Sequence, residues 1–312
     1  MALIDGAKTA VNTCMGVKKG EVVLIVTDTE KESIGRALFE VAQEAKAEAL
    51  LVTMEPRGRH GEEPPKTIAE MMRYADVIIA PTSYSLTHTQ ARKRANRAGA
   101  RIATMPGIIT KMMSSGGMTA DFKEVKRGVN KLAKKLDGAK SVTILTKAGT
   151  DFQVSVEGRR WYRDTGICHK SGEFMNLPAG EVFIAPKEGT AQGKVVIDGA
   201  FWEILEEPVT LEIKDGSAYR ISGSKEIAKQ ISKQGKEARN IAEVGVGMNP
   251  KAKIIGNVLE DEKVMGTVHV ALGDNSTFGG KVKAGIHVDG IIKNPTFIAD
   301  DRVIMEDGKL LV

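Results

Sequence analysis

Short apolar runs alternate with amphipathic helical segments over residues 21–139, and this alternation constrains the fold more than any other feature of the chain. The run "EVVLIVTD" (21–28) has the length and β-branched content of a buried strand, and the segment 31–48 that follows has its apolar residues at helical spacing. Further strands are predicted at 49–54, 76–81 and 101–106, and further helices at 64–75, 87–99 and 119–139. A repeated strand–helix–strand order predicts a parallel sheet with helices on both faces.

From about Ser141 the pattern changes to strands joined by turns that contain glycine. These strand segments are 141–158, 194–199, 208–222, 267–273, 285–292 and 302–311, with one clear helix at 224–234. The length of 312 residues suits two domains. We therefore predict an α/β fold class, with an N-terminal parallel-sheet α/β domain (1–140) and a β-rich α+β C-terminal metal-binding domain (141–312).

The composition indicates an ordinary globular protein. Hydrophobic residues make up 42% of the chain and charged residues 27%, which argues against disorder. The two cysteines fit a reducing compartment, and neither a signal peptide nor an apolar run of membrane-spanning length is evident. We expect a soluble cytoplasmic protein with no membrane partner.

The basic residues do not indicate nucleic-acid binding. The densest group lies within residues 92–101, and its spacing suits one solvated helix face among scattered acidic residues. We therefore expect no nucleic-acid partner for a chain of net charge +5.

Two of the five histidines, His269 and His287, lie 18 residues apart on predicted strands of the C-terminal half. His287 and Asp289 share a strand face because side chains two apart point the same way. A return of the chain between the two strands would bring all three side chains together. This set can bind Zn, Mn, Co or Fe(II). The alternative is a polar, solvent-facing sheet surface.

Two glutamates favour the metal interpretation. Glu181 follows a Pro-Ala-Gly turn and begins an apolar strand, and Glu243 lies among apolar residues and glycines. A carboxylate at the start of a buried strand is costly unless it is paired or bound to a cation. Taken singly, each could be an exposed strand start. Together with the histidines and Asp289, they suit a site for two metal ions that activate a shared water.

These motifs resemble the metallo-aminopeptidases of the aminopeptidase T/aminopeptidase S family. The matching block is Asn-x-Pro-x-x-Glu-Val-Phe-x-Ala-Pro at 176–186, and "HVALG" (269–273) is followed by a His-x-Asp pair. The resemblance implies a homodimer, a pair of divalent ions (Zn, Co or Mn) and release of N-terminal residues from peptides. It assigns the metal ligands to Glu181, Glu243, His269, His287 and Asp289.

The chain also resembles the 2,5-dihydroxypyridine 5,6-dioxygenase family, which looks like a shorter relative of the same fold. That resemblance implies one Fe(II) held by His269, His287 and Asp289, with Glu181 as a base near the substrate. The aminopeptidase family has an active-site tyrosine seven residues after the first histidine, where this chain has Ser276.

The leading functional prediction is a metal-dependent aminopeptidase-type hydrolase in which Glu181 or Glu243 acts as general base. The alternatives are an Fe(II) ring-cleaving dioxygenase and a metal-binding relative without turnover. The substrate is predicted to be a small peptide or small molecule, with Ser276 and His88 as candidate contacts. For His88 the alternative is an exposed position at a helix start capped by Thr87 or Thr89.

Overall fold

The structure is a computed structural model that describes residues 2–311, and the chain divides into two compact units. Unit 1 contains the residues up to 126, residues 164–179 and residues 250–252. Unit 2 contains residues 127–163, residues 180–249 and the chain from residue 253 onward. Each unit is therefore built from more than one stretch of chain, whereas the sequence pattern suggests a single boundary after residue 140.

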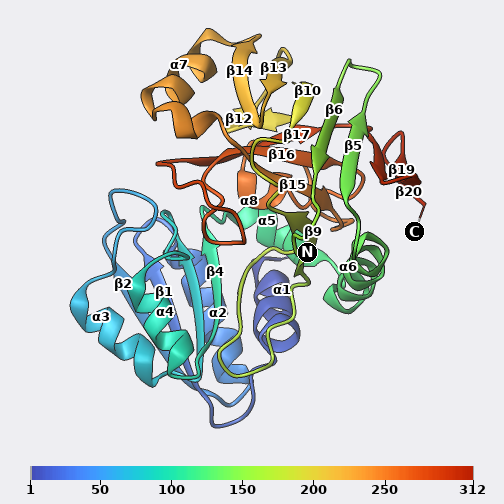
Figure 1. Cartoon of the computed structure of the whole chain (residues 1–312). Helices are drawn as coiled ribbons and strands as arrows, with labels where there is room; N and C mark the ends of the chain where they lie inside the picture. The colour runs from blue at the N-terminus through green and yellow to red at the C-terminus, as the bar shows by residue number, and fades with distance from the viewer. Residues whose placement is uncertain (1, 312) are drawn as a thin grey trace. The chain divides into compact units, whose positions relative to one another are not determined.

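Unit 1 is built on a five-stranded sheet in the order β2-β1-β3-β4-β8, and its strand pairs are parallel (Figure 1). The last strand returns from much later in the sequence to pair with β4. The elements of this unit are α1 Leu3–Lys8, η1 Thr9–Cys14, β1 Val22–Asp28, α2 Glu32–Glu44, β2 Glu48–Met54, α3 Lys66–Met71, η2 Met72–Tyr74, β3 Val77–Thr82, α4 Gln90–Arg97, β4 Arg101–Pro106, α5 Thr110–Ser114, η3 Gly117–Thr119 and β8 Phe174–Asn176. The first division between the two units falls within helix α6, Phe122–Leu136, after residue 126.

Helices cover both faces of the parallel sheet. On one face Leu24 and Val26 of β1 pack in a core cluster with residues of α3, η2 and α4. On the other face Gly35 of α2 lies so close to Thr27 that a Cβ at Gly35 would come within 2.8 Å of the threonine side chain. Successive strand residues point to opposite faces, so α2 and the α3/α4 pair lie on opposite sides of the sheet.

The arginine-rich segment is not the uniformly solvated helix face that its spacing predicts. Arg101 is 7% exposed on β4, and its guanidinium binds both carboxylate oxygens of Glu21 at 3.0 and 2.8 Å. The guanidinium of Arg92 lies over the ring of Phe174, 4.2 Å from its centroid. The prediction of a solvated face is wrong for these two residues because Arg101 is buried in its ion pair with Glu21 and Arg92 packs against β8.

Unit 2 contains an eight-stranded sheet, β14-β13-β10-β6-β5-β18-β19-β20, and a seven-stranded sheet, β12-β11-β17-β16-β15-β9-β7 (Figure 1). The elements are β5 Ser141–Leu145, β6 Asp151–Ser155, β7 Tyr162–Asp164, β9 Glu181–Ile184, β10 Gln192–Ile197, β11 Ala200–Phe201, β12 Glu203–Ile204, β13 Val209–Lys214, β14 Ser217–Ser222, α7 Lys225–Lys233, η4 Lys236–Arg239, β15 Ile241–Gly247, α8 Val258–Asp261, β16 Val268–Gly273, β17 His287–Ile292, β18 Thr296–Ala299, β19 Arg302–Glu306 and β20 Lys309–Leu310.

The predicted fold class is confirmed. The first half forms a parallel sheet covered by helices, and the second half consists mainly of antiparallel strands. Among the described residues, no helix has both the length and the apolar character needed to cross a bilayer.

Candidate metal centre

The central strands of the seven-stranded sheet bring the five predicted ligand residues onto one face. Strands β17, β16, β15 and β9 lie next to one another in that order, and their pairs are antiparallel. Directly opposed residues on antiparallel strands share a face. The register opposes Glu181 to Gly247, Glu243 to Ala271, Gly245 to His269, Ala271 to Asp289 and Gly273 to His287. It follows that Glu181, Glu243, His269, His287 and Asp289 all point to the same side.

Small residues between these side chains make room for them. Gly245 stands directly opposite His269, and a Cβ at Gly245 would lie 2.0 Å from the imidazole Nε2. The imidazole therefore lies across the backbone of β15, and only glycine fits beneath it.

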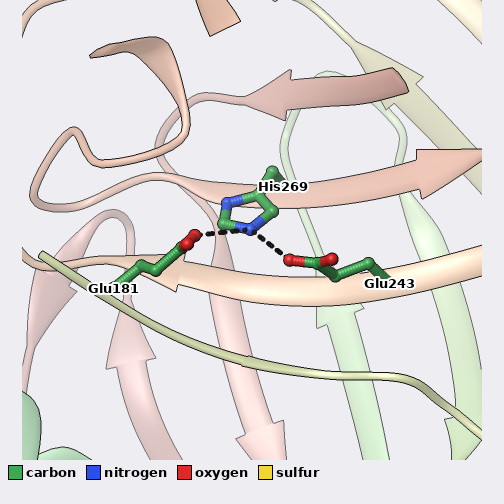
Figure 2. Close-up of side chains that lie close together, drawn as sticks. All are labelled: Glu181, Glu243 and His269. Atoms are coloured by element: carbon green, nitrogen blue, oxygen red, sulfur yellow. Dashed lines mark hydrogen bonds and ion pairs between the residues drawn. The ribbon is translucent and has the colours of Figure 1, made fainter. Parts of the chain in front are cut away.

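Glu181, Glu243 and His269 form what we call the inner group (Figure 2). The Nε2 atom of His269 is 3.1 Å from Glu181 Oε2 and 3.4 Å from Glu243 Oε1. Figure 2 shows the two carboxylates approaching the imidazole from opposite sides. All three residues are buried, so the group lies in a place where uncompensated charge is costly.

Glu243, His287 and Asp289 form the outer group. The Nε2 atom of His287 is 3.4 Å from Glu243 Oε2 and 3.7 Å from Asp289 Oδ2. Its Nδ1 atom lies 2.7 Å from the carbonyl oxygen of Asp274, to which it donates as Nδ1–H. In the neutral imidazole this hydrogen bond puts the Nε2 lone pair on the side of the carboxylates, which is the tautomer a metal ligand needs. The side chain of His287 is 31% exposed, and Asp289 is buried.

The two groups fit a divalent cation. Two buried ligand-type atoms of these residues, His269 Nδ1 and Asp289 Oδ1, have no hydrogen-bond partner among the described residues, and Glu181 Oε2 faces the His269 imidazole at 3.1 Å. The facing atoms of each group, one imidazole nitrogen and two carboxylate oxygens, lie within 4.8 Å of one another. Mixed nitrogen and oxygen donors of this kind suit Fe(II), Mn, Co or Zn. Glu243 belongs to both groups and is the residue that connects them.

Without a cation, protons on the two histidines offset the negative charge of the facing carboxylates. Burial alone lowers the pKa of a histidine, but the hydrogen bonds and charges of the facing carboxylates outweigh it. They hold the pKa of His269 and of His287 well above the usual range. Burial raises the pKa of Asp289, yet the His287 imidazole more than reverses this and lowers it. A metal ion must displace these protons in order to bind.

Lys263 and Glu262 also belong to this site, and sequence reasoning missed both. Lys263 is 1% exposed, and its Nζ atom donates to Glu181 Oε1 at 2.6 Å and to Glu262 Oε1. Burial, together with the charges of Glu181 and Asp289, raises the pKa of Glu262 well above its usual range despite the opposing charge of Lys263. Both residues belong to the acidic stretch "LEDEK" (259–263), whose composition gives no signal of burial.

Three aromatic side chains lie in a row next to His287, the exposed ligand candidate. The ring of Phe278 meets the His287 ring edge-on, with centroids 5.6 Å apart, and meets Phe183 at 5.7 Å. Phe183 stacks on Tyr162 with a centroid distance of 5.3 Å. We call Phe278, Phe183 and Tyr162 the aromatic row. It places apolar ring surfaces next to His287.

Neither of the two predicted substrate contacts is among the residues that form the inner and outer groups. His88 is exposed in unit 1, next to Thr89, whose hydroxyl caps α4 by accepting from the backbone N–H of Arg92. Ser276 is exposed in unit 2, and its N–H and hydroxyl both donate to Asp274 Oδ1. Ser276 thus supports the turn whose carbonyl oxygen binds His287.

A family profile and a curated relative both match this chain, and both carry the same family name. The sequence profile of the 2,5-dihydroxypyridine 5,6-dioxygenase family matches residues 2–312. The 2,5-dihydroxypyridine 5,6-dioxygenase of Pseudomonas putida is 25% identical over 259 residues, which are 76% of this chain and 71% of the relative.

Two solved structures share the fold. The structure of 2,5-dihydroxypyridine dioxygenase from Pseudomonas putida has a TM-score of 0.84 at 20% identity, covering 99% of this chain and 97% of that one. Wild-type AmpT from Thermus thermophilus has a TM-score of 0.73 at 18% identity, covering 99% of both chains. Both resemblances inferred from sequence are thus found, but the profile and the curated relative point to the shorter family. The chain belongs to the 2,5-dihydroxypyridine 5,6-dioxygenase family.

Proposed function

We propose that the chain is a metal-dependent dioxygenase that opens a hydroxylated nitrogen-containing aromatic ring. The observation that carries the proposal is the edge contact between Phe278 and His287. His287 is the exposed member of the five ligand candidates, so a substrate reaches the metal from its side. A planar ring arriving there would stack on the aromatic row, and aromatic pairs prefer such offset or edge-on contacts.

The ligand candidates and their neighbours would bind the metal ion and orient its ligands. His269, His287 and Asp289 would hold the ion, and the Asp274 carbonyl keeps the His287 ring in the required tautomer. A redox-active ion such as Fe(II) supplies the electronic coupling that lets O₂ react with a singlet aromatic ring. The low exposure of Glu243 and Asp289 keeps bulk water away from the carboxylate that would bind the ion and from the one that would accept the proton.

We assign the proton acceptor to Glu243. A ring hydroxyl must lose its proton to become a good chelating group, so the site needs a carboxylate near the substrate. Burial raises the pKa of Glu181, but the ammonium of Lys263 and the imidazole of His269 outweigh it and lower that pKa. The lowered pKa makes Glu181 a poor base. Glu243 faces both histidines and has no ammonium partner among the ion pairs described above.

The test is oxygen consumption with 2,5-dihydroxypyridine. The chain is loaded with Fe(II) without air, mixed with the substrate in oxygenated buffer, and followed by an oxygen electrode and by the ring absorbance. We expect equal molar loss of O₂ and of the ring, abolished by a chelator and restored by Fe(II). Loss of ring absorbance without oxygen uptake would contradict the proposal.

A second candidate, a two-metal aminopeptidase, is favoured by the position of Glu243. Its two oxygens face different histidines, Oε1 toward His269 and Oε2 toward His287, both at 3.4 Å. A carboxylate placed in this way can bridge two ions. Release of N-terminal residues from small peptides by the Zn-, Co- or Mn-loaded chain would support this candidate. Tight metal binding with neither reaction would indicate a relative that binds metal without turnover.

A further inference from the structure

We propose that Glu188 is a positioning residue for substrate binding, because it anchors the connection between β16 and β17 and so keeps the ring of Phe278 next to His287. This inference rests on the proposed function, since it concerns how the substrate ring is received at the aromatic row. Glu188 belongs to neither the inner nor the outer group and acts through the residues of the connection.

The connection consists of residues 274–286, all of them described, and it forms neither a helix nor a strand. It carries two features on which the proposed function depends. One is the carbonyl oxygen of Asp274, which accepts from His287 Nδ1–H, and the other is the ring of Phe278. A loop of this length without secondary structure has to be ordered by other contacts. The position of both features therefore depends on what holds the connection.

Asn275 closes the part of the connection that carries the phenyl ring. It is fully buried, its N–H donates to the carbonyl oxygen of Val282 at 3.1 Å, and its Oδ1 accepts from the N–H of Val282 at 2.9 Å. The N–H of Gly280 donates to the Asn275 carbonyl oxygen at 2.9 Å, and a Cβ at Gly280 would lie 1.9 Å from Asn275 Cγ. Phe278 thus lies within a loop that is closed around the side chain of Asn275.

Glu188, in the turn between β9 and β10, fastens this loop to the sheet. Its Oε1 accepts from Asn275 Nδ2 at 3.2 Å and from the N–H of Lys281 at 2.7 Å. Its Oε2 pairs with Arg159, whose guanidinium also donates to the carbonyl oxygen of Gly279. These contacts reach the loop both before and after the phenyl ring in the sequence. One carboxylate therefore fixes the loop directly and also through its arginine partner.

The pair of Arg159 and Glu188 is largely withdrawn from water, with side chains 14% and 22% exposed. Burial raises the pKa of Glu188, but backbone N–H groups, the charge of Arg159 and the Asn275 amide outweigh it and lower that pKa. Glu188 is therefore ionised at neutral pH. Hydrogen bonds to an ionised group are stronger than those between neutral groups, which suits the anchor of a segment without secondary structure.

The experiment is a double-mutant cycle on the KM for 2,5-dihydroxypyridine, with Glu188→Ala, Phe278→Leu and the double variant. Glu188→Ala alone should raise KM about three- to tenfold with little change in kcat, because it displaces a stacking surface. In the Phe278→Leu background the same change should alter KM by less than about twofold, since the ring that Glu188 positions is gone. Glu212→Ala breaks an arginine pair in the eight-stranded sheet and is the matched control, with an unchanged KM.

A second measurement needs neither metal nor substrate. The N–H groups of Gly280 and Val282 bond to Asn275 and not to Glu188, so their hydrogen exchange reports the order of the loop itself. It should be at least about tenfold faster in Glu188→Ala than in the wild type and in Glu212→Ala. Glu188→Gln keeps the shape and one acceptor oxygen, and both its KM and its exchange rates should lie between those of the wild type and Glu188→Ala. If Glu188→Ala does not fold, Glu188→Gln takes its place in the cycle.

Two outcomes would overturn the inference. One is a rise in KM of the same size in both backgrounds, which would mean that Glu188 acts through stability and not through Phe278. The other is wild-type exchange at Gly280 and Val282 in the folded Glu188 variants. Faster exchange in a chain that consumes no oxygen would contradict the proposed reaction and leave Glu188 standing as the anchor of the connection.

Discussion

The two units each contain a cluster of polar side chains on a sheet. The clusters differ in whether other residues of the chain provide hydrogen-bond partners for all the buried polar atoms. In unit 1, Thr104 donates its hydroxyl to Asn176 Oδ1 at 2.7 Å, and the Thr87 hydroxyl lies 2.8 Å from that of Thr104. In unit 2, buried Asp289 keeps an oxygen with no hydrogen-bond partner in the described part of the chain, and the free oxygen of buried Glu181 faces only the ionisable imidazole of His269. The first cluster is neutral and complete. The second is charged, and its buried carboxylates are compensated only when protons or a cation bind to it.

The largest expected effect is the loss of metal binding in Asp289→Asn. This change keeps the shape of the side chain and removes one of the two carboxylates of the outer group. We expect the metal affinity to fall by more than about 100-fold, beyond the 10- to 100-fold typical of residues that only support ligands. Isothermal titration with Mn(II) measures it.

The unit 1 cluster provides the control for this change. Asn176→Ala removes the amide that accepts from Thr104, and the ion count should stay at the wild-type value. Equal loss of metal from both variants would show that metal binding depends on global stability and not on the charged cluster.

The pH dependence of metal binding tests the same contrast. The folded-state pKa values of His269 and His287 lie above the ordinary value of about 6.5. In the metal-free chain, the stability that comes from their protonation is therefore fully present below that pH and is lost as pH rises through the raised values. The metal-loaded chain does not lose it, because the ion replaces the protons.

Metal affinity should therefore fall as the pH is lowered, by about tenfold per pH unit for each proton released on binding. Titrations in two buffers of different ionisation enthalpy count the protons at pH 7.5. An affinity that stays constant between pH 8 and pH 6 would mean that the histidines bind the metal without losing protons, which contradicts their assignment as ligands.

A smaller effect is expected at the aromatic row. Phe278→Leu removes the ring next to His287, and an aromatic contact contributes about 0.5–1.5 kcal/mol beyond its buried area. The KM for the ring substrate should rise about three- to tenfold with little change in kcat, because stacking binds substrate and transition state alike. Phe278→Tyr keeps the ring and should stay near the wild-type KM. Tyr219→Leu, on exposed β14, is the control away from the site. A fall in kcat without a change in KM would argue against a stacking role.

Strand periodicity is a local property, so the sequence alone predicts which candidate residues of one strand share a face. The two-residue spacing in "HVD" (287–289) places His287 and Asp289 on one face whatever their neighbours are. The central position of Glu243 could not be predicted in the same way. It depends on the register of β15 against β16, which includes an irregularity between Ile241 and Glu243.

The missed features depend on contacts between distant segments. Strand β8 spans only Phe174–Asn176. Three residues are too few to show a strand pattern in the sequence, and the strand is defined by its pairing with β4 in unit 1. Lys263 follows three acidic residues, a composition typical of a solvated surface. It is buried because Gly247, which has no side chain, lets the backbone of residues 263 and 264 pack closely against it. The start of α4 was predictable because its cap, Thr89, is a local signal.

The smallest effect concerns the cluster that needs no ligand. Thr104→Val replaces the buried hydroxyl with a methyl of similar shape and removes its hydrogen bond to Asn176 Oδ1. Thr87 remains within 3.3 Å of that oxygen, so the acceptor keeps a donor. The loss of unfolding free energy should therefore be about 1 kcal/mol, the usual net value of one hydrogen bond, measured by urea denaturation. The Mn(II) count and affinity should not change. A changed metal affinity in Thr104→Val would mean that the neutral cluster acts on the charged one, and the contrast between a cluster completed by the chain and a cluster completed by a cation would have to be abandoned.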